Sequence, residues 1–235
     1  MTGHSPERVI YDKLWQKAVA AFEGGAVRLD AFLKNRQADL RRGVSLAARP
    51  DPAVCAAVQR FLDEAAAVAP GQHFYRPPEF HLTVLPVIPG STSWRQAAQR
   101  LPEHLAALET VLRGRPAFSV VFRGVTASPE AVMIQGFPEG NALAQLRDDL
   151  RAALAGRGLD ENLDRRYKIA TAHMTVARFC TAMKDWRPLK SLLAANRERD
   201  FGTARFRTLQ LIEGDWYASA DTVRMLREYP LGNQP

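Results

Sequence analysis

Two short segments far apart in the chain repeat one chemical pattern. "FHLTVLP" places His81 two residues before Thr83, and "AHMTVARF" places His173 two residues before Thr175. Alternate side chains of a β-strand point to opposite faces, so each histidine shares a face with its threonine, while the apolar neighbours share the other. Each segment is therefore predicted to be a strand with one chemical face and one core face.

Two imidazoles that face each other across a cleft suit the chemistry of phosphodiesters. A neutral histidine can take a proton from an attacking water or hydroxyl, while a protonated histidine gives one to the leaving oxygen. Threonine hydroxyls can donate hydrogen bonds to the non-bridging phosphate oxygens as charge builds there. If the two halves of the chain pack about a pseudo-two-fold axis, both pairs meet around one substrate atom. No divalent cation is needed for this chemistry.

The two motifs resemble those of a known family, the 2H phosphoesterase superfamily, which includes bacterial 2'-5' RNA ligase-like proteins and cyclic nucleotide phosphodiesterases. The resemblance rests on "HLTV" and "HMTVAR" and extends to the strand-like stretches "FSVVFRGVTAS" and "VMIQG" between them. It implies a bilobal fold with a central cleft. It also implies that four residues bind and cleave the phosphoester: His81, Thr83, His173 and Thr175.

The predicted function is that of a metal-independent phosphoric diester hydrolase without a cofactor. The resemblance implies that its partner is RNA or a nucleotide with a 2'-5' or 2',3'-cyclic phosphodiester. Two other functions use part of the same pattern: a non-catalytic RNA-binding protein, and a mutarotase-like sugar isomerase with a facing acid and base. The complete set of motif residues argues against the first, and the threonines have no particular purpose in the second.

The stretches just before the two motifs contain three candidates for binding the substrate: Tyr75, Arg76 and Tyr167. An aromatic ring can stack on a base, and a cation can meet a phosphate, although packed rings and solvated charges are commoner. Arg178 matches an arginine that commonly follows the second motif in the resembling family. Strict alternation from His173 nevertheless places it on the opposite face, unless a bulge reverses this.

The remaining histidines are expected to play other roles. His73 is predicted to be a hydrogen-bonded structural residue, whereas His4 and His104 are predicted to lie on the surface. No HExxH or His-x-His motif indicates a metal site, and the glycines match neither nucleotide-binding fingerprint.

Composition limits the class of protein further. The net charge of +7 favours polyanionic partners. The two cysteines are too few for a disulfide framework. No apolar run reaches the roughly 18 residues of a membrane span, and no secretory signal opens the chain. The protein is therefore expected to be cytoplasmic and without a membrane partner.

Hydrophobic periodicity and turn residues predict the elements that position the two motifs. Helices are predicted at 6–22, 29–40, 52–68, 93–112 (interrupted at Pro102), 141–155 and 186–195. Strands are predicted at 43–50, on both sides of the Pro77–Pro78 kink, and at 117–128, 131–138, 170–179, 204–216 and 222–231.

Short turns between several strands favour an α+β fold with mostly antiparallel sheets. Together with the resemblance, this predicts two such sheets related by a pseudo-two-fold axis, with helices on the outer faces and a central cleft. Residues 1–40 are predicted to be an N-terminal helical extension, and residues 41–235 a single bilobal domain.

Overall fold

The computed structural model describes residues 5–164 and 168–232. Its helices are α1 (Pro6–Gly24), α2 (Pro52–Val68), α3 (Trp94–Ala98), α4 (Leu101–Leu112), α5 (Ala142–Ala155) and α6 (Arg187–Ala195). Short 3-10 turns are η1 (Ala31–Lys34), η2 (Arg36–Ala38) and η3 (Pro77–Glu79). The strands are β1 (Arg42–Ala48), β2 (His73–Phe74), β3 (Leu82–Ser91), β4 (Phe118–Ala127), β5 (Ala131–Pro138), β6 (Met174–Arg178), β7 (Asp200–Phe206), β8 (Thr208–Asp215) and β9 (Arg224–Pro230).

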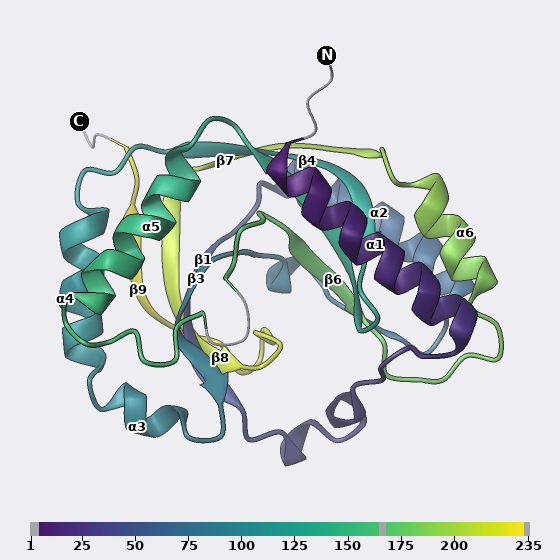
Figure 1. The fold of residues 1–235 in the computed structure, drawn as a ribbon, viewed down its shortest axis with the longest axis horizontal. Helices are drawn as coiled ribbons and strands as arrows, with labels where there is room; N and C mark the ends of the chain where they lie inside the picture. Colours follow the sequence, from purple (N-terminus) through teal and green to yellow (C-terminus); the bar gives the residue numbers. More distant parts are fainter. Residues whose placement is uncertain (1–4, 165–167, 233–235) are drawn as a thin grey trace.

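The strands form two sheets, one in each lobe. The four-stranded sheet has the order β3-β1-β8-β9, and the five-stranded sheet has the order β2-β6-β5-β4-β7. Every pair of neighbouring strands is antiparallel. Figure 1 shows α3, α4 and α5 outside one sheet and α1, α2 and α6 outside the other. The predicted α+β class with two antiparallel sheets is confirmed.

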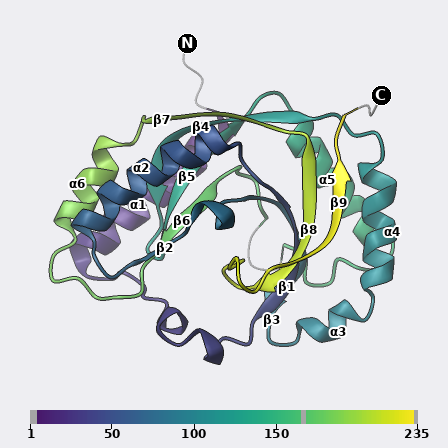
Figure 2. The same cartoon turned by 180° about the vertical axis from the view of Figure 1, so that it is seen from behind.

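Two helices cross between the lobes. The helix α2 follows β1 of the four-stranded sheet but packs against β7 and α6 of the other lobe. The helix α5 follows β5 of the five-stranded sheet but packs against α4 and β3. The view from behind shows the same exchange (Figure 2). Each of these helices therefore packs on the lobe opposite to that of the strand that precedes it, which links the two lobes.

The helix boundaries follow local capping chemistry. Ser5 Oγ accepts a hydrogen bond from the Arg8 amide at 3.3 Å where α1 begins, and Gly25 ends α1 in the left-handed region. Proline occupies the first turn of α1, α2, α4 and α6, where its missing amide hydrogen costs nothing. In the described part of the chain, no helix is both long enough and apolar enough to pass through a bilayer.

Two predicted elements differ from the structure. The predicted helix at 29–40 consists instead of η1 and η2, whose side chains are all at least partly exposed. With no buried apolar face, this stretch gains little from forming a regular helix. The predicted strand at 204–216 breaks at Arg207 into the end of β7 and all of β8, which belong to different sheets. No proline or glycine marks this break in the sequence.

Candidate active site

The two predicted motifs meet at one cavity. His81 directly precedes β3 and His173 directly precedes β6, and both line a cavity of about 870 Å³ together with Thr83 and Thr175. As alternation predicted, each histidine therefore shares a face with the threonine of its own motif, and that face lines the cavity. The fold brings all four motif residues together from opposite lobes.

A β-bulge follows the threonine in each motif strand. Thr83 pairs with Ala47 and Leu85 with Leu46, so Val84 is an extra residue in β3. In β6 the extra residue is Val176, because Thr175 pairs with Met133 and Ala177 with Val132. A bulge shifts by one position the alternation of the side chains that directly follow it. The cavity face therefore resumes three residues after each threonine, not two.

This bulge places Arg178 at the cavity, so the face that strict alternation assigned to it is wrong. Arg178 lines the cavity three residues after Thr175. Its Nε donates a hydrogen bond to the Tyr75 hydroxyl at 3.0 Å, and its guanidinium carbon lies 5.7 Å from the centroid of the Tyr217 ring. The equivalent position after Thr83 is Pro86, which also lines the cavity but carries no charge.

Each histidine ring is held at Nδ1. His81 Nδ1 lies 2.7 Å from the carbonyl oxygen of Glu79, and His173 Nδ1 lies 2.8 Å from the Thr171 hydroxyl. A carbonyl only accepts, so His81 carries its proton on Nδ1 and keeps Nε2 as the basic nitrogen when neutral. A hydroxyl can donate or accept, so the Thr171 contact is compatible with either tautomer of His173.

Arg147 of α5 joins the two motif segments. Its guanidinium donates to the carbonyl oxygens of Thr83, Val84 and Thr171, each at 2.9 Å. Thr83 and Val84 belong to β3, and Thr171 lies just before His173. Arg147 is 3% exposed, and its hydrogen bonds to other described residues go to these carbonyls. This side chain thus links the two motif segments by hydrogen bonds.

Sequence reasoning missed Arg147, although a signal was present. The buried residues of α5 are Leu143, Leu146, Arg147, Leu150 and Leu154, which form one helical stripe. A charged residue on such a stripe is buried and needs hydrogen-bond partners. The position of Arg147 therefore predicts a structural cation, but not the strands that it joins.

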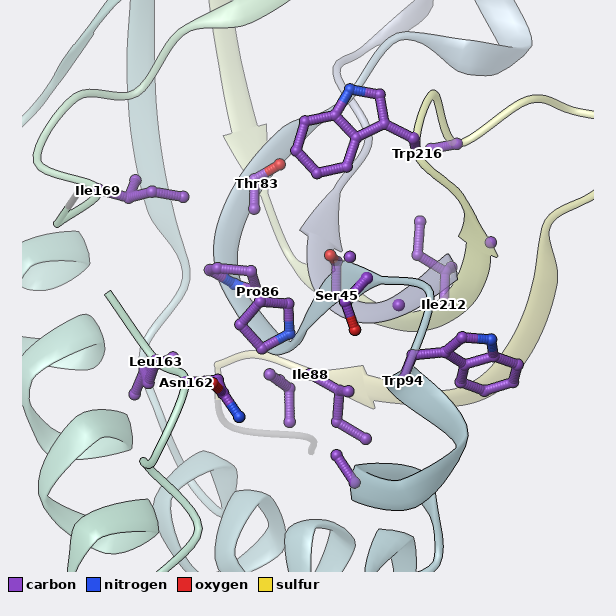
Figure 3. A pocket seen from close by; sticks show the side chains of 18 of the residues that line it. Ser45, Thr83, Pro86, Ile88, Trp94, Asn162, Leu163, Ile169, Ile212 and Trp216 are labelled. Carbon is purple, nitrogen blue, oxygen red and sulfur yellow. The ribbon is translucent and has the colours of Figure 1, made fainter. Parts of the chain in front are cut away.

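Part of the cavity beyond the motif residues is apolar, and we call it the apolar arm. It runs along β3 and is lined by Pro86, Ile88, Trp94, Leu163, Ile169 and Trp216. Charged residues also line the cavity, among them Arg100, Glu161 and Asp164. Figure 3 shows side chains from β3, α3, the segment after α5 and the β8–β9 loop around this arm. A side chain at Gly90 would place its Cβ 2.8 Å from the Trp216 ring, so only glycine leaves room for that indole.

The family model of the 2'-5' RNA ligase superfamily matches residues 50–215, which is more than half of the chain. The chain belongs to this superfamily. Its motifs therefore lie inside the matched region, whereas α1, η1 and η2 precede it.

Solved structures share the superfamily fold with this chain. TT0787 of Thermus thermophilus has a TM-score of 0.58 and 19% identity, and covers 83% of this chain and 100% of its own. E. coli LigT complexed with 3'-AMP has a TM-score of 0.54 and 13% identity, with 82% and 99% covered. A structure described as a phosphoesterase has a TM-score of 0.52 and 11% identity, with 82% and 99% covered. A search of curated proteins gives no match.

Burial and nearby cations make both histidines of this superfamily member weak bases. Burial lowers the pKa of His81 to about 4, with Arg49 and Arg178 adding to the effect and the Glu79 carbonyl opposing it. Burial, Arg147, His81 and Arg178 likewise lower the pKa of His173 to about 4. Both imidazoles are therefore neutral at pH 7 in the protein without substrate. An anion bound in the cavity favours protonation of one of them.

The three predicted substrate-binding residues have different positions. Tyr75 lines the cavity, is 4% exposed and accepts the bond from Arg178. Arg76 is not among the residues that line the cavity, and its exposed guanidinium pairs with Glu79 at 3.2 Å. Tyr167 lies outside the described residues. Of the two described candidates, the structure therefore brings Tyr75 to the motifs but not Arg76.

The two remaining described histidines also differ from each other. His73 packs its ring edge-on against Tyr75 and Tyr217, at centroid distances of 5.0 and 6.3 Å. His104 is 3% exposed and lines the cavity, so its predicted surface position is wrong. It shares the buried face of α4 with Leu108, one helical turn away. His4, also predicted to lie on the surface, is outside the described residues.

A metal centre has no ready ligand set in the described residues. No group of three or more histidine, cysteine, aspartate or glutamate side chains there is arranged to hold an ion.

Proposed function

We propose that the chain is a phosphoric diester hydrolase that acts on 2',3'-cyclic or 2'-5' RNA-type phosphodiesters without a metal. The observation that carries this proposal is the meeting of both His-x-Thr motifs at one cavity, with an arginine beside them. Membership in the 2'-5' RNA ligase superfamily supports a phosphoesterase or ligase reaction. The LigT structures with 3'-AMP and ATP support a nucleotide as the ligand.

The proposed reaction is in-line attack of water on phosphorus. One neutral imidazole takes the proton of the water as its oxygen bonds to phosphorus. The bond from phosphorus to the ribose oxygen breaks, and the other imidazole, protonated, gives its proton to that oxygen. A phosphomonoester results. Ligation is the reverse of these steps, with the two histidines exchanging roles.

Charge on the non-bridging oxygens needs donors that are already in place. Thr83 and Thr175 each supply a hydroxyl, and Arg178 supplies a guanidinium held by Tyr75. Donors fixed before the reaction stabilise the transition state without the cost of reorganising. Arg178 thus takes the phosphate-binding role that Arg76, paired outside the cavity, does not fill.

The apolar arm favours one orientation of the bound substrate. Its Trp94, Ile88 and Trp216 offer no charge to a phosphate but provide surface for an uncharged ring. Base-to-aromatic stacking contributes about 1–3 kcal/mol per base. We therefore place the group attached to the reacting phosphodiester in this arm (Figure 3).

The expected cytoplasmic location remains a prediction.

Hydrolysis of 2',3'-cyclic nucleotides and short 2'-5' linked RNAs in the presence of EDTA tests the proposal. We expect the wild type to release a phosphomonoester, and His81→Ala or His173→Ala to lower the rate by about 10² to 10⁴ each. RNA binding without any product would favour the non-catalytic binder instead. Conversion of a sugar phosphate without phosphoester cleavage would favour the isomerase.

A further inference from the structure

The segment between α1 and β1, residues 26–41, lies next to the site although it precedes the residues that the family model matches. We call it the linking segment. Figure 1 shows it passing from the lobe that carries α1 to β1 in the other lobe. Its backbone is fixed on the way: the Arg28 amide donates to Pro129 O at 2.8 Å, and the Asp30 amide donates to Phe179 O at 2.7 Å. Phe179 directly follows Arg178.

Three charged side chains of the linking segment converge on one loop that lines the cavity. Asp30 accepts a hydrogen bond from the Tyr217 hydroxyl at 3.0 Å. Arg36 donates to the Ser219 hydroxyl at 2.7 Å, and its guanidinium carbon lies 5.3 Å from the centre of the Tyr217 ring. Arg41 lies 3.4 Å from the Tyr217 hydroxyl and 4.5 Å from the centre of the Trp216 ring.

Tyr217, held by the linking segment, contacts Arg178 at the cavity. It is 2% exposed, lines the cavity and lies beside the guanidinium of Arg178 at 5.7 Å. Among the described residues, two contacts hold the Arg178 guanidinium: the hydroxyl of Tyr75 and the ring of Tyr217. The first comes from the matched region alone, whereas the second depends on a tyrosine whose hydroxyl is held by the linking segment.

We propose that Asp30, Arg36 and Arg41 are positioning residues of the active site, which hold Tyr217 as the wall against which Arg178 is aligned for a phosphate. This inference rests on the proposed function, because Arg178 is assigned there to the substrate phosphate. It gives the residues before the matched region a role in substrate binding. The geometry predicts that weakening these contacts raises KM more than it lowers kcat, since the phosphodiester already carries its negative charge when it binds to Arg178, and the histidines are held by other groups.

Full-length variants test the inference on 2',3'-cyclic nucleotide hydrolysis. We expect Asp30→Ala, Arg36→Gln and Tyr217→Leu each to raise KM roughly three- to tenfold, the range that one lost cation–π or hydrogen-bond contact allows. Tyr217→Phe keeps the ring and should fall between Tyr217→Leu and the wild type. Gln37→Ala is the matched control, because Gln37 is an exposed residue of the same segment and should leave KM unchanged.

A double-mutant cycle separates positioning from loss of stability. If Asp30 acts through Arg178, then Asp30→Ala should raise KM far less in an Arg178→Lys background than in the wild type. Equal increases in both backgrounds would overturn the inference, and so would an unchanged KM in the single variants.

The Arg178 Nε–H signal in a ¹H–¹⁵N spectrum tests alignment without any substrate. Arg178→Lys assigns the signal by its disappearance. We expect Tyr217→Leu and Asp30→Ala to shift or broaden it, while Gln37→Ala leaves it in place. An unchanged signal in all variants would contradict the inference. Because this readout needs no turnover, it decides the inference even if the wild type hydrolyses none of the phosphodiesters.

Discussion

The two histidine strands share one plan but differ in what accompanies it. In both β3 and β6, a histidine precedes the strand, a threonine shares its cavity, and a bulge follows the threonine. Three residues after the threonine, β3 has Pro86 and β6 has Arg178. The duplicated geometry supplies two imidazoles and two hydroxyls, whereas at the position three residues after the threonine only β6 carries a cation.

In the proposed function, this asymmetry orients the substrate. The arginine of the second strand is proposed to bind the phosphate, while the proline of the first strand begins the apolar arm along β3. A phosphodiester with one uncharged substituent therefore has a preferred direction between the histidines. Two identical strands would offer no such preference.

The largest expected effect on kcat/KM comes from substituting the residue three positions after the threonine in each motif strand. We expect Arg178→Ala to lower kcat/KM by roughly 10- to 100-fold, since a charge-assisted hydrogen bond contributes about 1.5–3 kcal/mol. Pro86→Ala at the equivalent position should lower it by less than about threefold, since no charge is lost. Steady-state kinetics on a 2',3'-cyclic nucleotide measures both. Equal losses would mean that the two strands are not chemically different.

Replacing Arg147, which links the two motif segments, should mainly lower the free energy of unfolding. Arg147→Met leaves the carbonyls of Thr83, Val84 and Thr171 without their donor, at about 1–3 kcal/mol for an unsatisfied buried group. We expect a free energy of unfolding lower by at least about 2 kcal/mol in urea denaturation. Gln145→Ala, on the exposed face of the same helix, is the control. A stable Arg147→Met protein with full activity would show that the strands need no such tie.

The Nδ1 partners offer a smaller contrast. Thr171→Val removes the hydroxyl next to His173 but keeps the shape of the side chain, and we expect kcat/KM to fall about three- to tenfold, as for one hydrogen bond. His81 has a backbone carbonyl as its partner, which no side-chain substitution removes. An unchanged pH profile and rate for Thr171→Val would show that this bond does not orient His173.

Acid should weaken the folded state through the same two histidines. Their pKa values of about 4 lie below the ordinary 6.5, so the unfolded chain binds more protons between these limits. Stability is therefore full above pH 6.5 and decreases as the pH falls toward 4. Urea denaturation at about pH 7 and about pH 4.5 should show a smaller loss in His81→Gln and His173→Gln than in the wild type. Histidine signals that titrate near 6.5 in both strands would contradict this.

Local patterns predicted the motifs, while long-range pairing decided the rest. The spacing of His81 and Thr83 sufficed to put both on one face, because alternation is local. The bulge that turns Arg178 into the cavity depends on how β6 pairs with β5, which the residues of β6 alone do not determine. Arg147 contacts strand β3 and the linking segment contacts the β8–β9 loop, both far away in the sequence, so these partners could not be predicted from periodicity.

The most direct test of the paired-histidine mechanism compares His81→Asn, His173→Asn and the double variant in hydrolysis of a 2',3'-cyclic nucleotide with EDTA present. Groups that act as one acid–base unit are strongly non-additive. We therefore expect each single variant to be nearly as inactive as the double variant. Losses that multiply, or a single variant that keeps most of the wild-type rate, would contradict the pairing of these two histidines.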